Sequence, residues 1–166
     1  MSTPLRIRRT ARAIVVNDRE EVLLIQHSDT SPANPKQPDR LIYWVAPGGG
    51  VEDNETYEAA AIRELKEETG VHIESVERCI LRRDIDLLYG KELVTSREYF
   101  FLARIVGRPT PTRFKVHPEE NISDFRWWPI SEIETSNETF FPEGLILLLK
   151  DILNPTLSNA SEIRLR

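Results

Sequence analysis

Three glutamates in one predicted helix could hold a divalent metal ion. Glu64 and Glu68 lie one turn apart, and Glu67 falls beside them within a sector of about 100° of the helical wheel. Like charges at this spacing cost roughly 0.2–0.5 kcal/mol per pair, and all three lie near the negative end of the helix dipole. A sequence selected only for helix stability would carry lysine there, so the acidic flank needs a separate explanation.

Two explanations are open from the helix alone. In the first, the flank faces solvent and Arg63 pairs with Glu67 four residues later. In the second, a hard divalent cation removes the repulsion, since Mg²⁺ and Mn²⁺ prefer oxygen ligands such as carboxylates, water and phosphate. The preceding run Pro47-Gly48-Gly49-Gly50 favours the second explanation, because glycines let the backbone approach a ligand closely. A tight turn between a strand and a helix would explain the same run.

The helices that must position these residues are predicted from periodicity and breakers. The acidic flank belongs to a helix over Glu55–Thr69, whose buried face centres on Leu65 and which ends at Gly70, a natural residue after a helix. A second, apolar helix is predicted over Pro142–Leu153, started by its proline and stopped before Asn154-Pro155.

The strands are predicted from short β-rich runs between turn residues. They comprise a hairpin of Ala13–Val16 and Glu21–Gln26, followed by Leu41–Ala46, Val71–Leu81, Arg97–Val106 and Asp124–Trp128. Three segments are predicted as loops: Ser28–Arg40, Asp84–Ser96 and Gly107–Asn121. The first of these loops is interpreted either as a mobile surface insertion or as a flap beside a substrate. This order of elements predicts a mixed α/β sandwich rather than a regular βαβ repeat.

Length and composition indicate one globular domain. The 166 residues are 40% hydrophobic and 30% charged, which is ordinary for a soluble protein with its own core. We expect a single domain over residues 1–153 and a C-terminal tail over residues 154–166. The single cysteine, Cys79, excludes an intrachain disulfide, and nothing in the sequence argues against a reducing cytoplasm.

Charge and hydropathy limit the partners. No apolar run approaches the ~20 residues of a membrane span, so no membrane partner is expected. The net charge is −5, whereas binding a long nucleic acid needs a clustered basic face. A small anionic substrate stays compatible with this charge, because a bound divalent metal reverses the local field. The sequence leaves the oligomeric state open, with a homodimer as one option.

The glycine run and the acidic helix together resemble the signature of a known family. Nine positions over the 23 residues from Gly49 to Val71 match the Nudix box without a gap: Gly49, Glu55, Arg63, Glu64, Leu65, Glu67, Glu68, Gly70 and Val71. Outside the box the likeness is looser, in the strand that ends Trp44-Val45-Ala46-Pro47 and in Phe125-Arg126-Trp127-Trp128-Pro129. The resemblance implies the Nudix fold, an α/β/α sandwich with a mixed sheet.

The resemblance also implies an activity, the hydrolysis of a diphosphate linkage in a nucleoside diphosphate derivative or a similar small molecule. Carried over by position, it implies Mg²⁺ or Mn²⁺ as the cofactor, with Glu64, Glu67 and Glu68 as metal ligands and the Gly49 carbonyl as a further ligand. It implies that Arg63 and Glu55 organise the box by ion pairing.

The general base that activates the attacking water is left between two sources. One is a glutamate of the box, and the other is Glu119 or Glu120 in the later loop, where family members often carry a base. The phosphate groups would need arginines, and the candidates are Arg12, Arg83, Arg97 and Arg126. The aromatic side chains available to a base or sugar are Tyr43, Trp44, Tyr57, Tyr89, Trp127 and Trp128.

Three other functions compete with this interpretation. Isomerisation of an allylic diphosphate uses a related fold, but it needs a catalytic cysteine in a loop and Cys79 is predicted within a strand. A non-catalytic nucleotide sensor with a Nudix-like domain often lacks box glutamates, and this chain keeps all of them. Chemistry on capped RNA favours a basic groove, which the charge of −5 does not suggest. The loops that would choose the substrate carry no decisive motif.

Overall fold

The computed structural model describes residues 2–110, 121–154 and 163–164. Nine strands of these residues form one sheet in the order β8-β3-β2-β1-β6-β5-β9, with β4 paired to β1 and β7 paired to β2. The sheet is mixed, because β1 runs parallel to β6 and antiparallel to β2. The strands are β1 Ile7–Asn17, β2 Glu21–Ser28, β3 Ile42–Val45, β4 Gly48–Gly50, β5 Arg78–Tyr89, β6 Glu92–Ile105, β7 Ile122–Pro129, β8 Phe140–Phe141 and β9 Ile163–Arg164.

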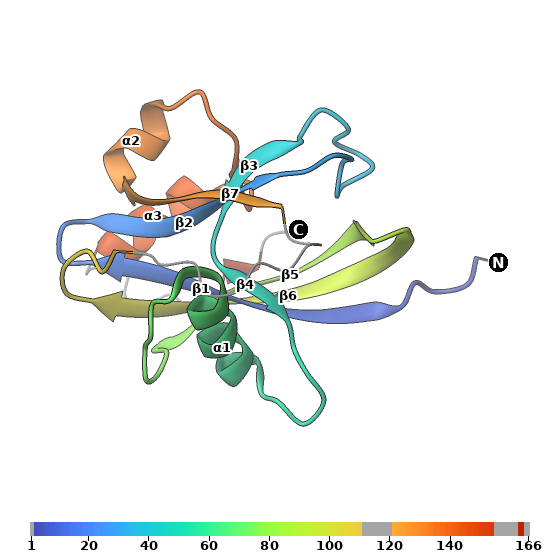
Figure 1. Ribbon diagram of the computed structural model, residues 1–166, viewed down its shortest axis with the longest axis horizontal. Coiled ribbons are helices and arrows are strands. Elements are labelled where there is room, and N and C mark those ends of the chain that lie inside the picture. The colour runs from blue at the N-terminus through green and yellow to red at the C-terminus, as the bar shows by residue number, and fades with distance from the viewer. Residues whose placement is uncertain (1, 111–120, 155–162, 165–166) are drawn as a thin grey trace.

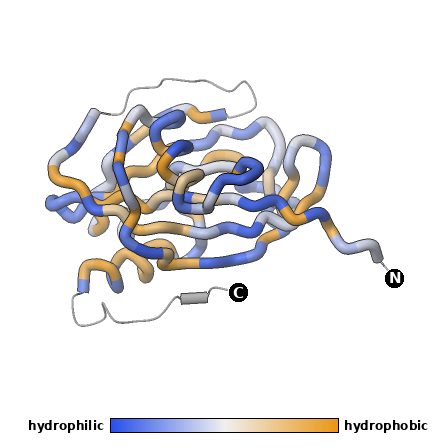
Figure 2. The backbone as a smooth tube through the Cα atoms, turned by 90° about the horizontal axis from the view of Figure 1, so that it is seen from below, coloured by the Kyte–Doolittle hydropathy of each residue, from blue (hydrophilic) through white to orange (hydrophobic). Residues whose placement is uncertain are grey.

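Helices cover both faces of this sheet (Figure 1). One face packs against α1, Tyr57–Thr69, through a cluster that includes the fully buried Leu65. The other face packs against α2, Ile130–Thr135, and α3, Leu145–Leu153, through a second cluster that includes Phe100 and Leu149. Figure 2 shows α3 as a largely hydrophobic coil and the connecting loops as mostly hydrophilic. The predicted α/β class, with helices on two sides of a mixed sheet, is confirmed.

The predicted hairpin at the N-terminus is confirmed, and one side chain closes its turn. Asn17 Oδ1 accepts hydrogen bonds from the backbone N–H groups of Arg19 and Glu21, both at 3.0 Å. This is the local turn that asparagine forms with its own backbone, and it sets the register in which Val16 faces Val22.

The limits of α1 follow from its end residues. Thr56 Oγ1 accepts a hydrogen bond from the Ala59 N–H at 3.1 Å, which satisfies one of the open donors at the start of the helix. Gly70 has a φ of 77° and donates its N–H to the Lys66 carbonyl at 2.8 Å, as a left-handed residue after a helix does. The predicted end at Thr69 is confirmed, and the start lies two residues after the predicted Glu55.

Two predicted strands are wrong in extent. Residues 71–77 form no strand, and β5 begins only at Arg78, although Val71 and Ile73 are buried against α1. Residues 84–96, predicted as a loop, belong to the long hairpin of β5 and β6. Charged residues pair across the two strands at the end of this segment: Asp84 with Arg97 at 2.9 Å and Arg83 with Glu98 at 2.6 Å.

The C-terminal third holds elements that the sequence did not reveal. Both α2 and β8 were not predicted, and β8 pairs in parallel with β3. The last helix begins at Leu145 rather than Pro142, because Gly144 precedes it with a φ of 83°. Within the expected tail, Ile163–Arg164 pairs in parallel with β5. Within the described ranges, no helix is long and apolar enough to cross a membrane.

Candidate functional site

The glycine strand β4 lies directly against the acidic flank of α1. The Gly48 N–H donates a hydrogen bond to Glu68 Oε1 at 2.6 Å. A Cβ atom on Gly49 would lie 2.6 Å from Glu64 Cδ, closer than any side chain tolerates. Glycine at position 49 therefore lets the strand backbone pass this close to the Glu64 carboxylate. Glycine at position 48 is required by β1 instead, because a Cβ there would lie 2.3 Å from the Ala11 carbonyl oxygen. The run is thus more than a tight turn.

One arginine holds the carboxylates together. Arg63 donates to both oxygens of Glu55, at 2.8 and 2.9 Å, and to the Gly50 carbonyl at 2.9 Å. Its Nη1 atom donates to Glu64 Oε1 at 3.0 Å and to Glu67 Oε2 at 3.3 Å. The hydrogen bond from Arg63 lowers the pKa of Glu55, and the same bond raises the pKa of Arg63. Arg63 thus ties the start of the box, β4 and α1 into one unit.

Several carboxylates in this unit share the one guanidinium of Arg63. Four carboxylates lie within 4.0 Å of the Arg63 guanidinium, since Glu52 is also 3.9 Å away. Glu64 and Glu68 are buried, with 8% and 2% of their surface exposed, while Glu67 is partly open to solvent. A buried surplus of negative charge is costly unless a cation compensates it.

The donor set therefore suits a hard cation, although its present arrangement does not enclose one. In the part of the chain that the structure describes, no three histidine, cysteine, aspartate or glutamate side chains form a group ready to hold a metal. Arg63 Nη1 lies between Glu64 and Glu67 instead. Both carboxylates would have to turn from Arg63 toward a cation.

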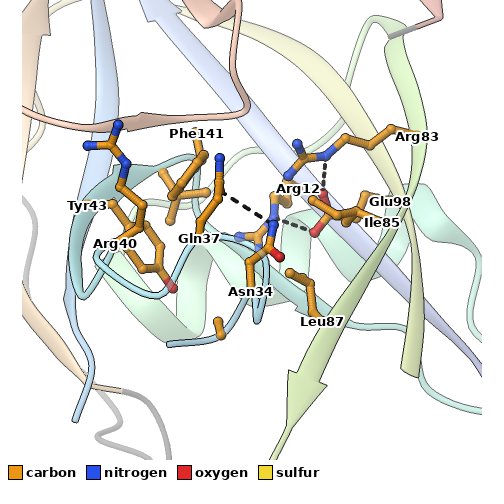
Figure 3. A pocket seen from close by; sticks show the side chains of 12 residues that line it. Arg12, Asn34, Gln37, Arg40, Tyr43, Arg83, Ile85, Leu87, Glu98 and Phe141 are labelled. Atoms are coloured by element: carbon orange, nitrogen blue, oxygen red, sulfur yellow. Dashed lines mark hydrogen bonds and ion pairs between the residues drawn. The ribbon is translucent and has the colours of Figure 1, made fainter. Parts of the chain in front are cut away.

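The structure separates the four candidate arginines into two groups. Arg12 and Arg83 converge on Glu98: Arg83 Nε donates to Glu98 Oε2 at 2.6 Å, and Arg12 Nε lies 3.6 Å from Glu98 Oε1 (Figure 3). The other two point elsewhere. Arg97 pairs with Asp84 at 2.9 Å on an exposed part of the hairpin, and Arg126 pairs with Glu132 at 2.6 Å.

Arg12 and Arg83 line a small pocket with a volume of about 60 Å³. The segment predicted as a flap or insertion supplies one wall and is tied down rather than detached: the Ala33 carbonyl accepts from the Leu88 N–H at 2.7 Å, and Arg40 donates to Thr139 at 3.0 Å. The pocket is lined by Arg12, Ala33, Asn34, Gln37, Arg40, Tyr43, Val45, Arg83, Ile85, Leu87, Glu98 and Phe141.

The pocket and the acidic cluster share a wall. Arg12 is the register partner of Gly48, and its Nη1 atom donates to the Ala46 carbonyl at 2.9 Å. Gly48 in turn donates its N–H to Glu68. The backbone of residues 46–48 therefore connects the arginine side chain in the pocket to a carboxylate of α1.

Of the aromatic candidates, only Tyr43 lines this pocket. Its ring stacks on His27 with 5.4 Å between centroids, and its hydroxyl donates to Asp29 at 2.9 Å. Burial raises the pKa of Tyr43, and burial followed by the charge of Arg12 lowers the pKa of His27 to about 4. The others pack elsewhere: Trp44 against Trp128, Tyr57 against Tyr99, Trp127 by a bond to the Pro109 carbonyl, and Tyr89 under Arg8.

Two further predictions have different outcomes. Cys79 lies in β5, half-buried, with its thiol directed to the Leu81 carbonyl, so the strand placement that disfavoured the isomerase holds. Glu119 and Glu120 lie outside the described residues. The sequence analysis missed Glu98, whose full burial depends on pairing with two arginines from other strands and leaves no local signal.

Comparison with known proteins identifies the family. The family model described as NUDIX domain matches residues 6–148. The RNA pyrophosphohydrolase of Novosphingobium aromaticivorans is 33% identical over 52% of this chain and 60% of its own length, and that of Roseobacter denitrificans is 32% identical over 72% and 75%. The chain thus spans less than two thirds of the former relative, and 63% of the one from Sphingopyxis alaskensis.

Solved structures agree on the fold. The MutT protein from Methanosarcina mazei Go1 matches with a TM-score of 0.64 at 18% identity, over 90% of this chain and 94% of the other. The NUDIX domain of Shewanella oneidensis NrtR, complexed with ADP ribose, matches with a TM-score of 0.65 at 21% identity, over 93% and 91%. The α/β/α sandwich that the box implied is confirmed. With a family match across most of its length and the matching fold, the chain belongs to the NUDIX domain family.

Proposed function

We propose that this protein hydrolyses a diphosphate linkage with the help of a divalent metal ion. The observation that carries the proposal is the packing of β4 on α1, where the Gly48 N–H donates to Glu68 and Gly49 lies so close to Glu64 that a Cβ there would displace the carboxylate. Membership of the NUDIX domain family and similarity to several RNA pyrophosphohydrolases support the same class of reaction.

We assign the metal to Glu64, Glu67 and Glu68, with the Gly49 carbonyl as a further ligand and Mg²⁺ or Mn²⁺ as the ion. When bound, such an ion neutralises phosphate oxygens and makes the phosphorus accessible to attack by water. Arg63 anchors α1 to Glu55 and to the Gly50 carbonyl and so keeps the helix beside β4 when Glu64 and Glu67 turn toward the ion. The non-catalytic sensor is the less favoured alternative, because all three carboxylates are retained.

A glutamate of the box is our preferred general base. Glu67 is the most exposed of the three carboxylates and therefore the best placed to receive a proton from solvent water. Glu119 and Glu120 are the competing choice. Since general base catalysis contributes about 10²–10⁴ in rate, Glu119→Gln and Glu120→Gln should each cost less than about tenfold in kcat if the box supplies the base.

The substrate that we favour is a nucleoside diphosphate derivative or a similar small molecule. The second candidate is a phosphate anhydride carried by RNA, because several relatives are RNA pyrophosphohydrolases. The two are separated by turnover of a nucleotide panel against a short RNA with a 5′-triphosphate. A kcat/KM for the RNA above that of every nucleotide would replace our first choice with the second.

The metal requirement has a direct test. Chelation with EDTA should abolish turnover, and millimolar Mg²⁺ or Mn²⁺ should restore it. A ligand that binds only the folded state adds about 2.7 kcal/mol at 100 times its Kd, so the melting temperature should rise on adding metal. Full activity after exhaustive chelation would rule out the proposed mechanism. Absence of turnover on every substrate with either metal would favour the non-catalytic sensor.

A further inference from the structure

Two half-buried arginines and one buried glutamate form a row on the face of the sheet opposite α1. Glu98 on β6 is the register partner of Arg83 on β5, and Arg12 lies on the neighbouring β1. Glu98 is 1% exposed, and the side chains of Arg12 and Arg83 are 17% and 15% exposed. The row forms the inner wall of the pocket under residues 29–41 (Figure 3).

Not all hydrogen-bond donors of the arginines in this row are used within the described part of the chain. Within the described residues, Arg83 uses only its Nε atom, which donates to Glu98, so both terminal nitrogens are left for the pocket. Arg12 Nε is buried and makes no hydrogen bond to the part of the chain that the structure describes. This nitrogen is closed to the pocket and faces Glu98 Oε1 at 3.6 Å, so the donors that the row offers to a ligand are terminal guanidinium nitrogens.

The charge in the pocket is opposite to that of the whole chain. Its charged lining residues are three arginines, Arg12, Arg40 and Arg83, and one carboxylate, Glu98, which leaves two positive charges in excess. The chain carries a net charge of −5. Such a local reversal selects anions, because arginine presents paired donors that match phosphate oxygens.

The side-chain amides in the pocket are already engaged. Gln37 Nε2 donates to Glu143 at 2.5 Å, and Gln37 Oε1 accepts from Asn34 Nδ2 at 3.4 Å. Asn34 Oδ1 accepts from the Lys36 N–H at 2.9 Å. A neutral base would need these amides to form hydrogen bonds along its edge, whereas an anion needs only the open arginine nitrogens. The arrangement therefore favours an anion.

We propose that this pocket binds a phosphate group of the substrate other than the scissile diphosphate, with Arg12 and Arg83 as ligands and Glu98 as the residue that positions them. The inference rests on the proposed function and narrows it to substrates that carry a further phosphate, such as nucleoside polyphosphates or a 5′-phosphorylated end. The shared wall of residues 46–48 joins this pocket to the acidic cluster, as one extended substrate requires.

Binding of inorganic tripolyphosphate tests the pocket without catalysis. The dissociation constant is measured by calorimetry in EDTA at about 0.15 M salt, which screens exposed surface charges. Arg83→Gln should weaken binding by at least about tenfold, since it removes charge-assisted hydrogen bonds. Arg97→Gln is the matched control, because Arg97 lies on the same hairpin but pairs with Asp84 on the surface, and it should change binding by less than about twofold. Equal effects of the two variants would overturn the proposal.

Glu98→Gln decides between an anion and a neutral base by the sign of its effect. Glutamine keeps an oxygen to accept from Arg83 but removes the negative charge, so tripolyphosphate should bind at least as tightly as to the wild type. If the pocket instead bound a neutral nucleobase that donates a hydrogen bond to Glu98, the variant would lose the charged acceptor. Weaker binding of tripolyphosphate by Glu98→Gln would contradict the proposed anion site. If Glu98→Gln does not fold, Arg83→Lys replaces it: partial recovery of binding relative to Arg83→Gln is expected, and no recovery would count against a charged ligand.

Kinetics link the pocket to turnover. With Mg²⁺ present, Arg83→Gln should raise KM for ATP at least about fivefold more than KM for ADP-glucose, whose outer group is uncharged. An equal change in KM for both substrates would show that the pocket does not bind a further phosphate group. Glu67→Gln should lose turnover but bind tripolyphosphate as tightly as the wild type. Turnover tests the metal site and tripolyphosphate binding tests the pocket, so failure of one proposal can be distinguished from failure of the other.

Discussion

Glu67 is the residue on which the metal assignment depends most directly. Glu67→Gln should lower kcat by at least about 100-fold, because it removes a ligand charge from the centre of the cluster. The melting temperature without metal should not fall, since a like charge near Glu64 is lost and Arg63 keeps Glu55 and Glu64 as partners.

The control for Glu67 is Glu58→Gln in the first turn of the same helix, where the side chain is exposed. Its kcat should stay within about twofold of the wild type. Near-normal turnover by Glu67→Gln on the best substrate would refute the metal assignment.

Two adjacent glycines offer a sharper steric test of the same site. A Cβ on Gly49 would collide with the Glu64 carboxylate at 2.6 Å, while a Cβ on Gly50 would lie 3.1 Å from Arg8 Nη2, the end of a flexible side chain. Gly49→Ala should therefore displace Glu64 and reduce kcat by about 100-fold, as misplacement by an ångström does.

Gly50→Ala should keep kcat within about threefold, because Arg8 can move aside. Both variants are compared by steady-state kinetics and circular dichroism. Equal losses in the two would mean that general flexibility of β4, rather than contact with Glu64, is what the reaction needs.

At the scale of the element, α1 depends for its stability on Thr56, the residue that caps its N-terminus. Thr56→Ala should remove the bond to the Ala59 N–H and cost about 1 kcal/mol. For a chain of this size that is a fall of roughly 2–4 °C in melting temperature. Thr56→Ser keeps the hydroxyl and should restore most of the loss, with kcat unchanged in both because the carboxylates lie in the last turns. An unchanged melting temperature in Thr56→Ala would show that packing alone fixes the helix start.

At the scale of the whole molecule, His27 makes folding depend on pH. Its folded pKa is about 4, lowered by burial and then by Arg12, against an ordinary value of 6.5. Between these values the unfolded chain binds a proton that the folded chain does not, so stability falls as the pH falls from 6.5 toward 4. From pH 7 to 5 this contributes a loss of about 2 kcal/mol.

His27→Phe should remove that part of the slope and keep the ring stacked on Tyr43. Urea unfolding of both proteins at pH 7, 6 and 5 measures the difference. Parallel stability curves for wild type and variant would mean that His27 takes up its proton in the folded state as readily as in the unfolded chain.

The sequence by itself determined the parts that depend on neighbours along the chain. The 3.6-residue period, Gly70 and the nine box positions placed the acidic helix and its family, since all of these lie within 23 residues. The turn at Asn17 likewise needs only its own side chain and the next few backbone groups. The strands over residues 84–96 were missed, because their pairing joins residues on opposite strands of the hairpin and depends on no short pattern along the chain.

Only the tertiary structure decided which arginines share a site. Arg12 and Glu98 are 86 positions apart and meet because β1 runs parallel to β6, a pairing that no local pattern encodes. The same pairing buries Glu98, while a change of face along the strand leaves Arg97 on the surface. The close approach of Gly49 to Glu64 also depends on tertiary structure, because pairing with β1 holds β4 beside α1. Contacts between distant segments are fixed by sheet register and packing, so they form only when the whole chain has folded.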